Sequence, residues 1–178
     1  EQHVHNLDVA NWVMGSLPVK ALGFGGRQVR TDPAYGHIFD HFAVEYEYPG
    51  GQRITSMCRQ QDGTASKVGE FFIGTRGTSN GYDRIQGRRE WRHPELKDMN
   101  PYVEEHRDLV ASIRAGRPLN EGRRIAESTL TAIMGRESAY TGQSVTMDEL
   151  LASNLAIMPP EPIGFDPLPV PAVPMPGE

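Results

Sequence analysis

Residues 42–59, FAVEYEYPGGQRITSMCR, determine the fold class of this 178-residue chain. The first half alternates in polarity, as expected for an extended strand whose successive side chains point to opposite faces. The apolar face of this strand carries Phe42, Val44, Tyr46 and Tyr48. Pro49-Gly50-Gly51 then supplies a turn, and a second extended run follows from Arg53 to Arg59. The pattern predicts an antiparallel β-hairpin with one covered face.

Helices and further strands are expected on both sides of this hairpin. Strands are expected at residues 19–26, 68–73 and 83–86, with a turn at 32–37 and a glycine-rich turn at 74–81. Helices are expected at residues 2–14, from the Asn100-Pro101 cap to Gly116, at about 120–141, and after the capping-box pair Thr146 and Glu149. Because the helices do not alternate with the strands, the sequence predicts an α+β domain: an open, mostly antiparallel β-sheet with helices on one face.

The two longer helices show helical spacing of apolar residues, which predicts their buried faces. The buried stripe expected for the first consists of Val103, Leu109, Val110 and Ile113. The buried set expected for the second consists of Ile125, Ala126, Leu130, Ile133, Met134 and Tyr140.

The end of the chain is rich in proline, with eight of the fourteen prolines at residues 159–176. Proline excludes a helix or a central strand there, so an extended arm is expected. Apolar residues between the prolines favour an arm that packs on a surface of this subunit or of a neighbour. The sequence thus predicts a folded domain at residues 1–157 and an arm at residues 158–178.

Composition excludes several classes of function. The chain is 38% hydrophobic and 23% charged, which is typical of a globular domain. Its net charge of −5 offers no basic block for nucleic acid. No apolar run reaches the ~20 residues that span a membrane. The single cysteine, Cys58, excludes an internal disulfide.

The first helix carries a candidate proton-transfer group. Helical spacing places Glu1, His5, Asp8 and Trp12 on one side, so His5 lies between two carboxylates beside an apolar wall. The same spacing places His3 about 200° from His5, which argues against a shared metal ion. Ordinary surface ion pairs explain the pattern as well, so composition alone does not assign a role to His5.

A second polar cluster lies in the predicted turn and at the start of the hairpin. Its members are Tyr35, His37, Asp40 and His41, with Arg27 shortly before the turn, and such side chains can bind hydroxyl groups. Turn and cap chemistry is an equally good explanation. The nearby Gly23-Phe24-Gly25-Gly26 lacks the third glycine of a dinucleotide fingerprint, so no such fingerprint is expected in this chain.

Several segments in order resemble the C-terminal domain of the Gfo/Idh/MocA oxidoreductases, in a bacterial branch. They are EQHVHNLDVANWVMG, PVKALGFGGR, YGHIFDHFAVEYEYPGG, MCRQQDG, VGEFFIGTRGTSNG, NPYVEEHRDLVASIRAGRPLNEGRRIAESTLTAIMGRESAYTG and the proline-rich end. The resemblance implies an open-sheet fold similar to the C-terminal domains of dihydrodipicolinate reductase and glyceraldehyde-3-phosphate dehydrogenase. It also implies that the chain lacks an N-terminal Rossmann domain.

The resemblance further implies the chemistry. The full protein is expected to oxidise a secondary alcohol of a sugar, cyclitol or polyol, with NAD or NADP held mainly by the missing domain. His5 corresponds to the family's catalytic histidine, and Glu1 stands where the family usually has Asp. Asp8, Trp12 and the second polar cluster are then expected to bind substrate. The isolated chain is expected to be inactive and to hold no cofactor or metal.

The resemblance also implies a homodimer or homotetramer formed through the free sheet face. Export signals in this branch favour a periplasmic location, although a cytoplasmic one remains open. Two other classes of function stay open as well. One is a non-catalytic carbohydrate-binding or oligomerisation module, which the Glu1 departure supports. The other is a metal-dependent lyase or isomerase that uses His3, His5 and His41.

Overall fold

The computed structural model describes residues 3–94, 99–156, 158, 164–165 and 169–177. The chain divides into two compact units, each described by itself. The first unit is Glu1–Ala65 with Glu127–Glu178, and the second is Ser66–Ala126. The predicted boundary near residue 157 lies at residues outside the described part, so it stays a prediction.

The first unit is built on a four-stranded antiparallel sheet in the order β3-β2-β1-β8. Its strands are β1 (Lys20–Gly26), β2 (His41–Glu47), β3 (Arg53–Arg59) and β8 (Val145–Thr146). Its helices are α1 (Val4–Met14), the short 3-10 helix η1 (Pro33–Tyr35), the part of α3 (Gly122–Thr141) from Glu127 onward, and α4 (Met147–Ala152). The predicted hairpin is confirmed, because β2 and β3 pair across the Pro49-Gly50-Gly51 turn.

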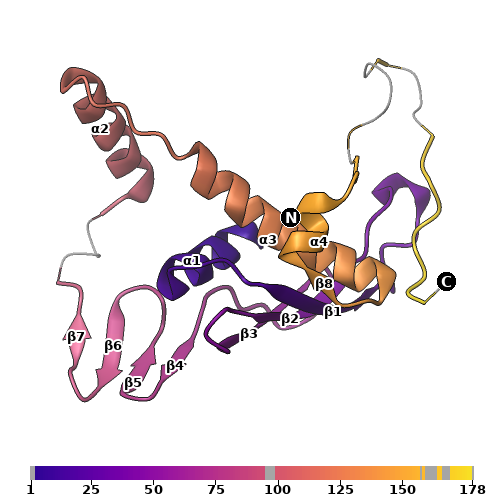
Figure 1. Cartoon of the computed structure of the whole chain (residues 1–178), viewed down its shortest axis with the longest axis horizontal. Helices are drawn as coiled ribbons and strands as arrows, with labels where there is room; N and C mark the ends of the chain where they lie inside the picture. The colour runs from indigo at the N-terminus through magenta and orange to yellow at the C-terminus, as the bar shows by residue number, and fades with distance from the viewer. Residues whose placement is uncertain (1–2, 95–98, 157, 159–163, 166–168, 178) are drawn as a thin grey trace. The chain divides into compact units, whose positions relative to one another are not determined.

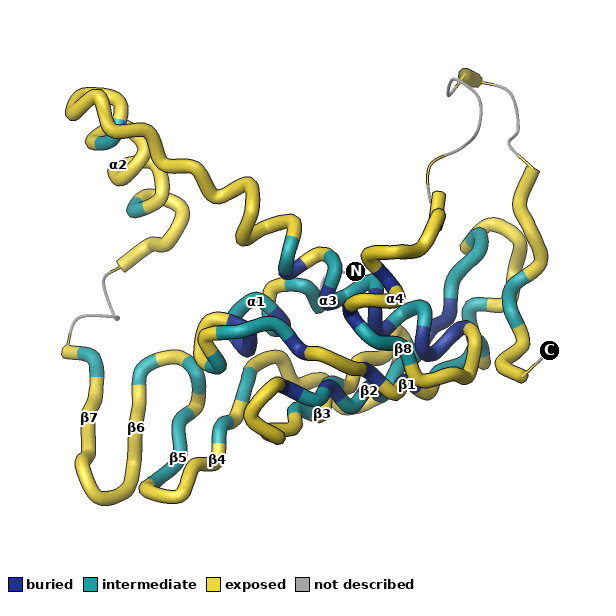
Figure 2. Tube along the Cα trace, viewed as in Figure 1, coloured by how far each residue is buried: buried dark blue, intermediate teal, exposed yellow. Residues whose placement is uncertain are grey.

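One face of this sheet is covered by helices and forms the core (Figure 1, Figure 2). Val44 and Tyr46 of β2 are buried against Leu7 of α1, Met134 of α3 and Leu150 of α4. The predicted alternation in β2 is therefore confirmed, because these side chains lie on the covered face. Gly15 ends α1 in a left-handed conformation, as its position predicts.

The helix α3 packs on the sheet through small residues. Its buried side chains include Ser128, Thr131, Ser138 and Ala139, whereas Ile125 is 58% exposed. The predicted burial of Ile125 is thus wrong, and that of Met134 and Tyr140 is confirmed. The cause is backbone proximity, since a Cβ added at Gly23 of β1 would lie 2.9 Å from the carbonyl oxygen of Gly135 in α3. Bulky residues do not fit between a helix and a sheet that approach so closely.

This close approach predicts that Gly23→Ala strongly destabilises the fold. A Cβ at Gly23 would lie 2.8 Å from the backbone nitrogen of Ala139, so α3 would have to move away from β1. We expect a loss of about 1–3 kcal/mol in the free energy of unfolding, the usual cost of overpacking a core. The matched control is Gly74→Ala in another strand, where the nearest atom lies 3.6 Å away. Equal midpoints in urea denaturation for the two variants would contradict the prediction.

The second unit contains its own antiparallel sheet, in the order β4-β5-β6-β7. Its elements are β4 (Phe72–Gly74), β5 (Gly77–Ser79), β6 (Arg84–Gly87), β7 (Trp91–Arg92) and α2 (Pro101–Arg114). The sequence predicts one open sheet, and this number is wrong because the described strands form two small sheets. The predicted strand at 68–73 is only partly right, and the predicted turn at 74–81 contains β5, where Gly77 pairs with Gly74 and Gly87.

The helix α2 begins as its sequence predicts but does not bury the expected stripe. The Asn100 side chain accepts a hydrogen bond from the Tyr102 amide, which confirms the predicted N-cap. None of its residues is buried, and the side chains expected in the core are 43–69% exposed: Val103, Leu109, Val110 and Ile113. No described helix is long and apolar enough to cross a membrane.

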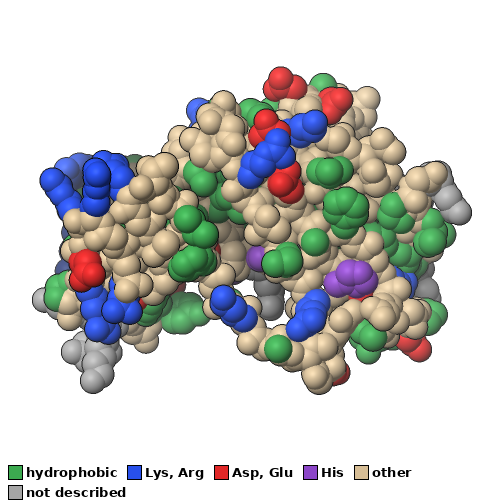
Figure 3. All heavy atoms as spheres, turned by 90° about the horizontal axis from the view of Figure 1, so that it is seen from below, with side chains coloured by type: hydrophobic (Ala, Val, Ile, Leu, Met, Phe, Trp, Pro, Cys, Tyr) green, Lys and Arg blue, Asp and Glu red, His purple; other side chains and the backbone are tan. Residues whose placement is uncertain are grey.

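The other face of the first sheet points away from α1, α3 and α4, the described helices that cover the core (Figure 1), and is called the open face. Seen from below, apolar, charged and histidine side chains are intermixed (Figure 3). Exposed apolar side chains on the open face are Leu22, Phe24 and Met57, at 41%, 68% and 71% exposure. The register places Glu45 and Glu47 of β2 beside them, and both carboxylates pair with Arg53 of β3. The open face is therefore mixed, with apolar and ion-paired side chains next to one another.

The described end of the chain, residues 169–177, contacts two parts of the first unit. The carbonyl oxygen of Ala172 lies 2.9 Å from Nε2 of His37. The amide of Gly177 donates to the carbonyl oxygen of Thr141 at 3.4 Å. Pro176 and Gly177 also line an apolar groove with Leu22 of β1. Much of the predicted arm lies outside the described residues, so the arm stays a prediction.

Candidate functional site

The helix α1 presents His5 to solvent. His5 and Trp12 are both exposed, Trp12 by 74%. Among the described residues, the His5 side chain makes neither a hydrogen bond nor an ion pair. Asp8 instead accepts a hydrogen bond from the Ser128 hydroxyl at 2.6 Å. No hydrogen bond joins the side chains of Asp8 and His5 among the described residues, and Glu1 lies outside them, so the role of this group stays a prediction.

The opposite side of α1 joins the core through polar groups that the sequence analysis missed. Asn11 is buried, its amide nitrogen donates to the Thr131 hydroxyl at 3.0 Å, and its oxygen accepts from the Tyr48 hydroxyl at 2.7 Å. Burial raises the pKa of Tyr48 to about 12, so this phenol stays a hydrogen-bond donor at neutral pH. The triad fixes α1 against the end of β2, and with it the position of His5.

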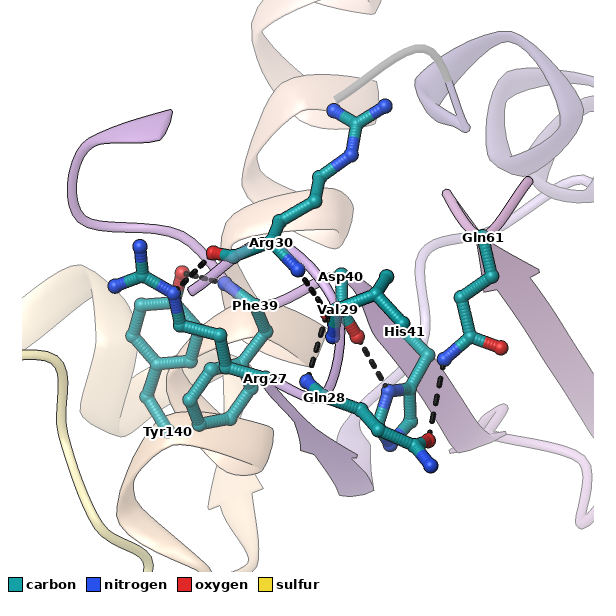
Figure 4. A network of polar contacts seen from close by, with 9 residues as sticks. All are labelled: Arg27, Gln28, Val29, Arg30, Phe39, Asp40, His41, Gln61 and Tyr140. Atoms are coloured by element: carbon teal, nitrogen blue, oxygen red, sulfur yellow. Dashed lines mark hydrogen bonds and ion pairs between the residues drawn. The ribbon is translucent and has the colours of Figure 1, made fainter. Parts of the chain in front are cut away.

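The loop between β1 and β2 is organised by Asp40 (Figure 4). Its Oδ2 atom accepts hydrogen bonds from the consecutive amides of Gln28, Val29 and Arg30, at 2.7, 2.6 and 2.9 Å. Its Oδ1 atom lies 2.7 Å from Nδ1 of His41. The Asp40 side chain is fully buried. This carboxylate therefore acts as the centre around which the loop closes.

Two opposing effects act on the pKa of Asp40. Burial raises it, because a charged carboxylate loses its hydration. The three backbone amides and His41 lower it, because they donate to the charged form. The hydrogen bonds prevail, so the pKa of Asp40 lies well below its ordinary value. Asp40 is ionised at neutral pH.

The other predicted residues of this loop make contacts within the chain. The guanidinium of Arg27 donates to the carbonyl oxygens of Arg30 and Asp32. The Tyr35 ring lies under the guanidinium of Arg30, 5.4 Å from it. Nε2 of His37 contacts the carbonyl oxygen of Ala172. The His37 ring also packs edge-on against the Tyr140 ring, with 5.8 Å between the ring centroids. These contacts show that turn chemistry explains much of the loop, and a role in substrate binding stays a prediction.

His41 differs from its neighbours because part of its ring is accessible. Its side chain is 39% exposed, and Nδ1 is held by Asp40. Its register partner is Gly26, where an added Cβ would lie 3.2 Å from Cε1 of the imidazole. The ring therefore lies over Gly26, a position that a larger residue would crowd. Gly26 belongs to the GFGG sequence, whose glycine pattern was the only hint of this contact.

The described residues do not fit a nicotinamide dinucleotide. Gly23 and Gly25 belong to strand β1, where Gly23 donates its amide to the Ser138 hydroxyl and Gly25 pairs with Phe42. They do not form the glycine-rich turn before a helix that binds a pyrophosphate. Among the described residues, no three His, Cys, Asp or Glu side chains gather to hold a metal ion.

The chain is similar to known proteins in its structure. No family model and no curated protein matches the sequence. The fold is similar to that of an aldose-aldose oxidoreductase from Caulobacter crescentus solved with glycerol, with a TM-score of 0.61, 20% identity, and coverage of 80% of this chain and 45% of that one. It is also similar to the WlbA dehydrogenase from Bordetella pertussis solved with NADH and UDP-GlcNAcA, with a TM-score of 0.60, 17% identity, and coverage of 82% and 43%.

A third similar structure is myo-inositol 2-dehydrogenase from Lactobacillus plantarum, with a TM-score of 0.54, 16% identity, and coverage of 80% and 46%. The chain spans less than half the length of each of these three structures. At such low identity the similarity shows the fold alone. The chain therefore has an α+β fold that recurs as part of larger sugar and polyol oxidoreductases.

Proposed function

We propose that this chain is the substrate-binding part of a NAD(P)-dependent oxidoreductase that acts on a secondary alcohol of a sugar, cyclitol or polyol. The observation that carries the proposal is the shared fold. The match covers at least 80% of this chain, and the three solved proteins are named for aldose, nucleotide-sugar or inositol chemistry. The cofactor would be held by a dinucleotide-binding domain outside this chain, since its own glycines lie in a strand.

Within this proposal His5 is the general acid and base. Alcohol oxidation releases the hydroxyl proton as hydride leaves carbon, and an imidazole with a pKa near neutrality is suited to accept it. His5 is exposed on a helix that the Asn11 triad fixes to the sheet. When bound, the nicotinamide supplies the hydride acceptor. Asp8 and Trp12 would contact the substrate, and Glu1 would assist His5. In the second polar cluster, Arg27, Tyr35, His37 and His41 would bind hydroxyl groups, and Asp40 would position His41.

Copies of the chain are proposed to associate through the apolar part of the open face, which carries Leu22, Phe24 and Met57. These exposed side chains offer apolar contact, and the ion-paired Glu45 and Arg53 offer polar contact. Sedimentation of the chain across a range of concentrations tests this. A lone monomer throughout that range would count against association through this face.

The decisive test measures NAD(P)H formation by the protein that joins this chain to its dinucleotide-binding domain. A panel of sugars, inositols and linear polyols is the substrate set. Turnover of at least one secondary alcohol is expected. Binding of a sugar without any turnover would instead support the second candidate, a non-catalytic carbohydrate-binding module. This second candidate is supported by the His5 side chain, which has no hydrogen-bond partner among the described residues. The metal-dependent alternative gains no support, because Ser56 lies against His3 and Asp40 holds His41.

A further inference from the structure

The charge state of Asp40 determines how His41 is protonated. An ionised carboxylate accepts hydrogen bonds and donates none, so the 2.7 Å contact requires His41 to donate from Nδ1. A neutral imidazole with its proton on Nδ1 has a lone pair on Nε2. Asp40 has no capacity for a further ligand, since it is buried and already takes four hydrogen bonds. Its function is therefore to position His41.

The accessible part of His41 lies on the open face, opposite to the face that α1 covers. The register pairs His41 with Gly26 and with Arg59, and paired side chains of a sheet share a face. Arg59 is held by the carbonyl oxygen of Ala65. Among the described residues, Nε2 of His41 has no partner. When its ring is neutral, His41 thus presents one fixed hydrogen-bond acceptor at this edge of the open face.

Two glutamine side chains lie beside this acceptor. Figure 4 shows the His41 ring next to Gln28, and the Gln61 amide donates to the Gln28 oxygen at 3.3 Å. The pair leaves one amide NH₂ and one carbonyl oxygen for other partners. The three side chains come from the β1–β2 loop, the start of β2 and the segment after β3. Together they offer both donors and acceptors, the combination that recognises a hydroxyl group.

We propose that His41, Gln28 and Gln61 form a hydroxyl-binding site for a sugar or polyol on the open face, with Asp40 as its positioning residue. The site is distinct from His5, which projects from a helix on the covered face. The choice of ligand rests on the proposed function, because that proposal supplies the substrate class. A ligand hydroxyl donates to Nε2 of His41, and the glutamine amides bond to the same or a neighbouring hydroxyl.

The test is NMR of the full 178-residue chain labelled with ¹⁵N in histidine, with myo-inositol as the probe. Before ligand is added, the ring nitrogen shifts of neutral His41 are expected to show a proton on Nδ1 and none on Nε2. Addition of myo-inositol is expected to shift the His41 signals in a saturable way. His106 is the matched control, because it is exposed and its Nδ1 lies 2.6 Å from the carbonyl oxygen of Tyr102.

Variants separate ligand binding from folding. Gln28→Ala and Gln61→Ala are each expected to weaken binding about threefold to tenfold, the effect of one lost hydrogen bond, while circular dichroism stays unchanged. A proton on Nε2, or equal shifts of His41 and His106, overturns the proposal, and so does an unmoved His41 signal at saturating probe. These results are independent of turnover. If His5→Ala abolishes dehydrogenase activity while the His41 signals do not shift with myo-inositol, the proposed function stands and this site is excluded.

Discussion

Replacing His5 with alanine is expected to lower kcat by about 10²-fold or more in the protein that joins this chain to its dinucleotide-binding domain. A positioned general base contributes about 10²–10⁴-fold to proton transfer, and alanine has no group to replace it. His5 is exposed and makes no hydrogen bond among the described residues, so its removal costs the fold little. The loss is therefore expected in kcat, with cofactor affinity and the free energy of unfolding almost unchanged.

The matched control for this variant is His106→Ala. His106 is also an exposed histidine on a helix, but it lies in the second unit and has no proposed role in proton transfer. Steady-state kinetics with saturating NAD(P) measures both variants, and a cofactor titration checks that binding is intact. An unaltered kcat for His5→Ala would remove His5 from the mechanism. A similar loss for both variants would show that the effect is not local to α1.

Much of the first sheet follows from local pattern in the sequence. The alternation from Phe42 to Tyr48 predicts both the strand and its buried face, because a period of two fixes which side chains share a face. The capping pair Thr146 and Glu149 predicts the start of α4, and both of its hydrogen bonds are present. Such features depend on residues within a few positions of one another, where spacing alone determines the geometry.

The face that α3 buries was not predictable in the same way. Apolar periodicity favours Ile125 as a core residue, whereas the structure exposes it and buries Ser128, Thr131 and Ser138. Small residues are selected there because Gly23 and Gly135 bring backbone close to backbone. That distance is a property of tertiary packing, and sequence periodicity does not contain it.

The candidate site shows the same division. Helical spacing puts Asp8 and His5 on one side of a helix, whereas the bond from Ser128 to Asp8 joins residues 120 positions apart. The sequence also groups Asp40 with His41, and the structure joins them by a hydrogen bond. The three amides that converge on Asp40 carried no signal in the sequence, because backbone donors have no side-chain identity.

Replacing Asp40 with alanine is expected to cost roughly 3 kcal/mol or more in the free energy of unfolding. The substitution leaves the amides of Gln28, Val29 and Arg30 without their acceptor, and each hydrogen bond to a charged group contributes about 1.5–3 kcal/mol. Asp32→Ala is the matched control. Asp32 also accepts from a backbone amide, that of Ala34 at 2.8 Å, but it is exposed and water can replace it. Urea denaturation at pH 7 is expected to show a much larger loss for Asp40→Ala.

The pH dependence of this stabilisation follows from the lowered pKa of Asp40. An aspartate in the unfolded chain has a pKa of about 3.9, and folding lowers the pKa of Asp40 below this value. The unfolded state therefore binds more protons as the pH falls below about 4, which favours unfolding. The stability that ionised Asp40 contributes is fully present above that pH and is lost as the pH falls toward the folded pKa. Urea midpoints of the wild type and Asp40→Asn should accordingly converge between about pH 5 and pH 2. A difference between them that is constant over this range would show that the charge of Asp40 does not hold the loop.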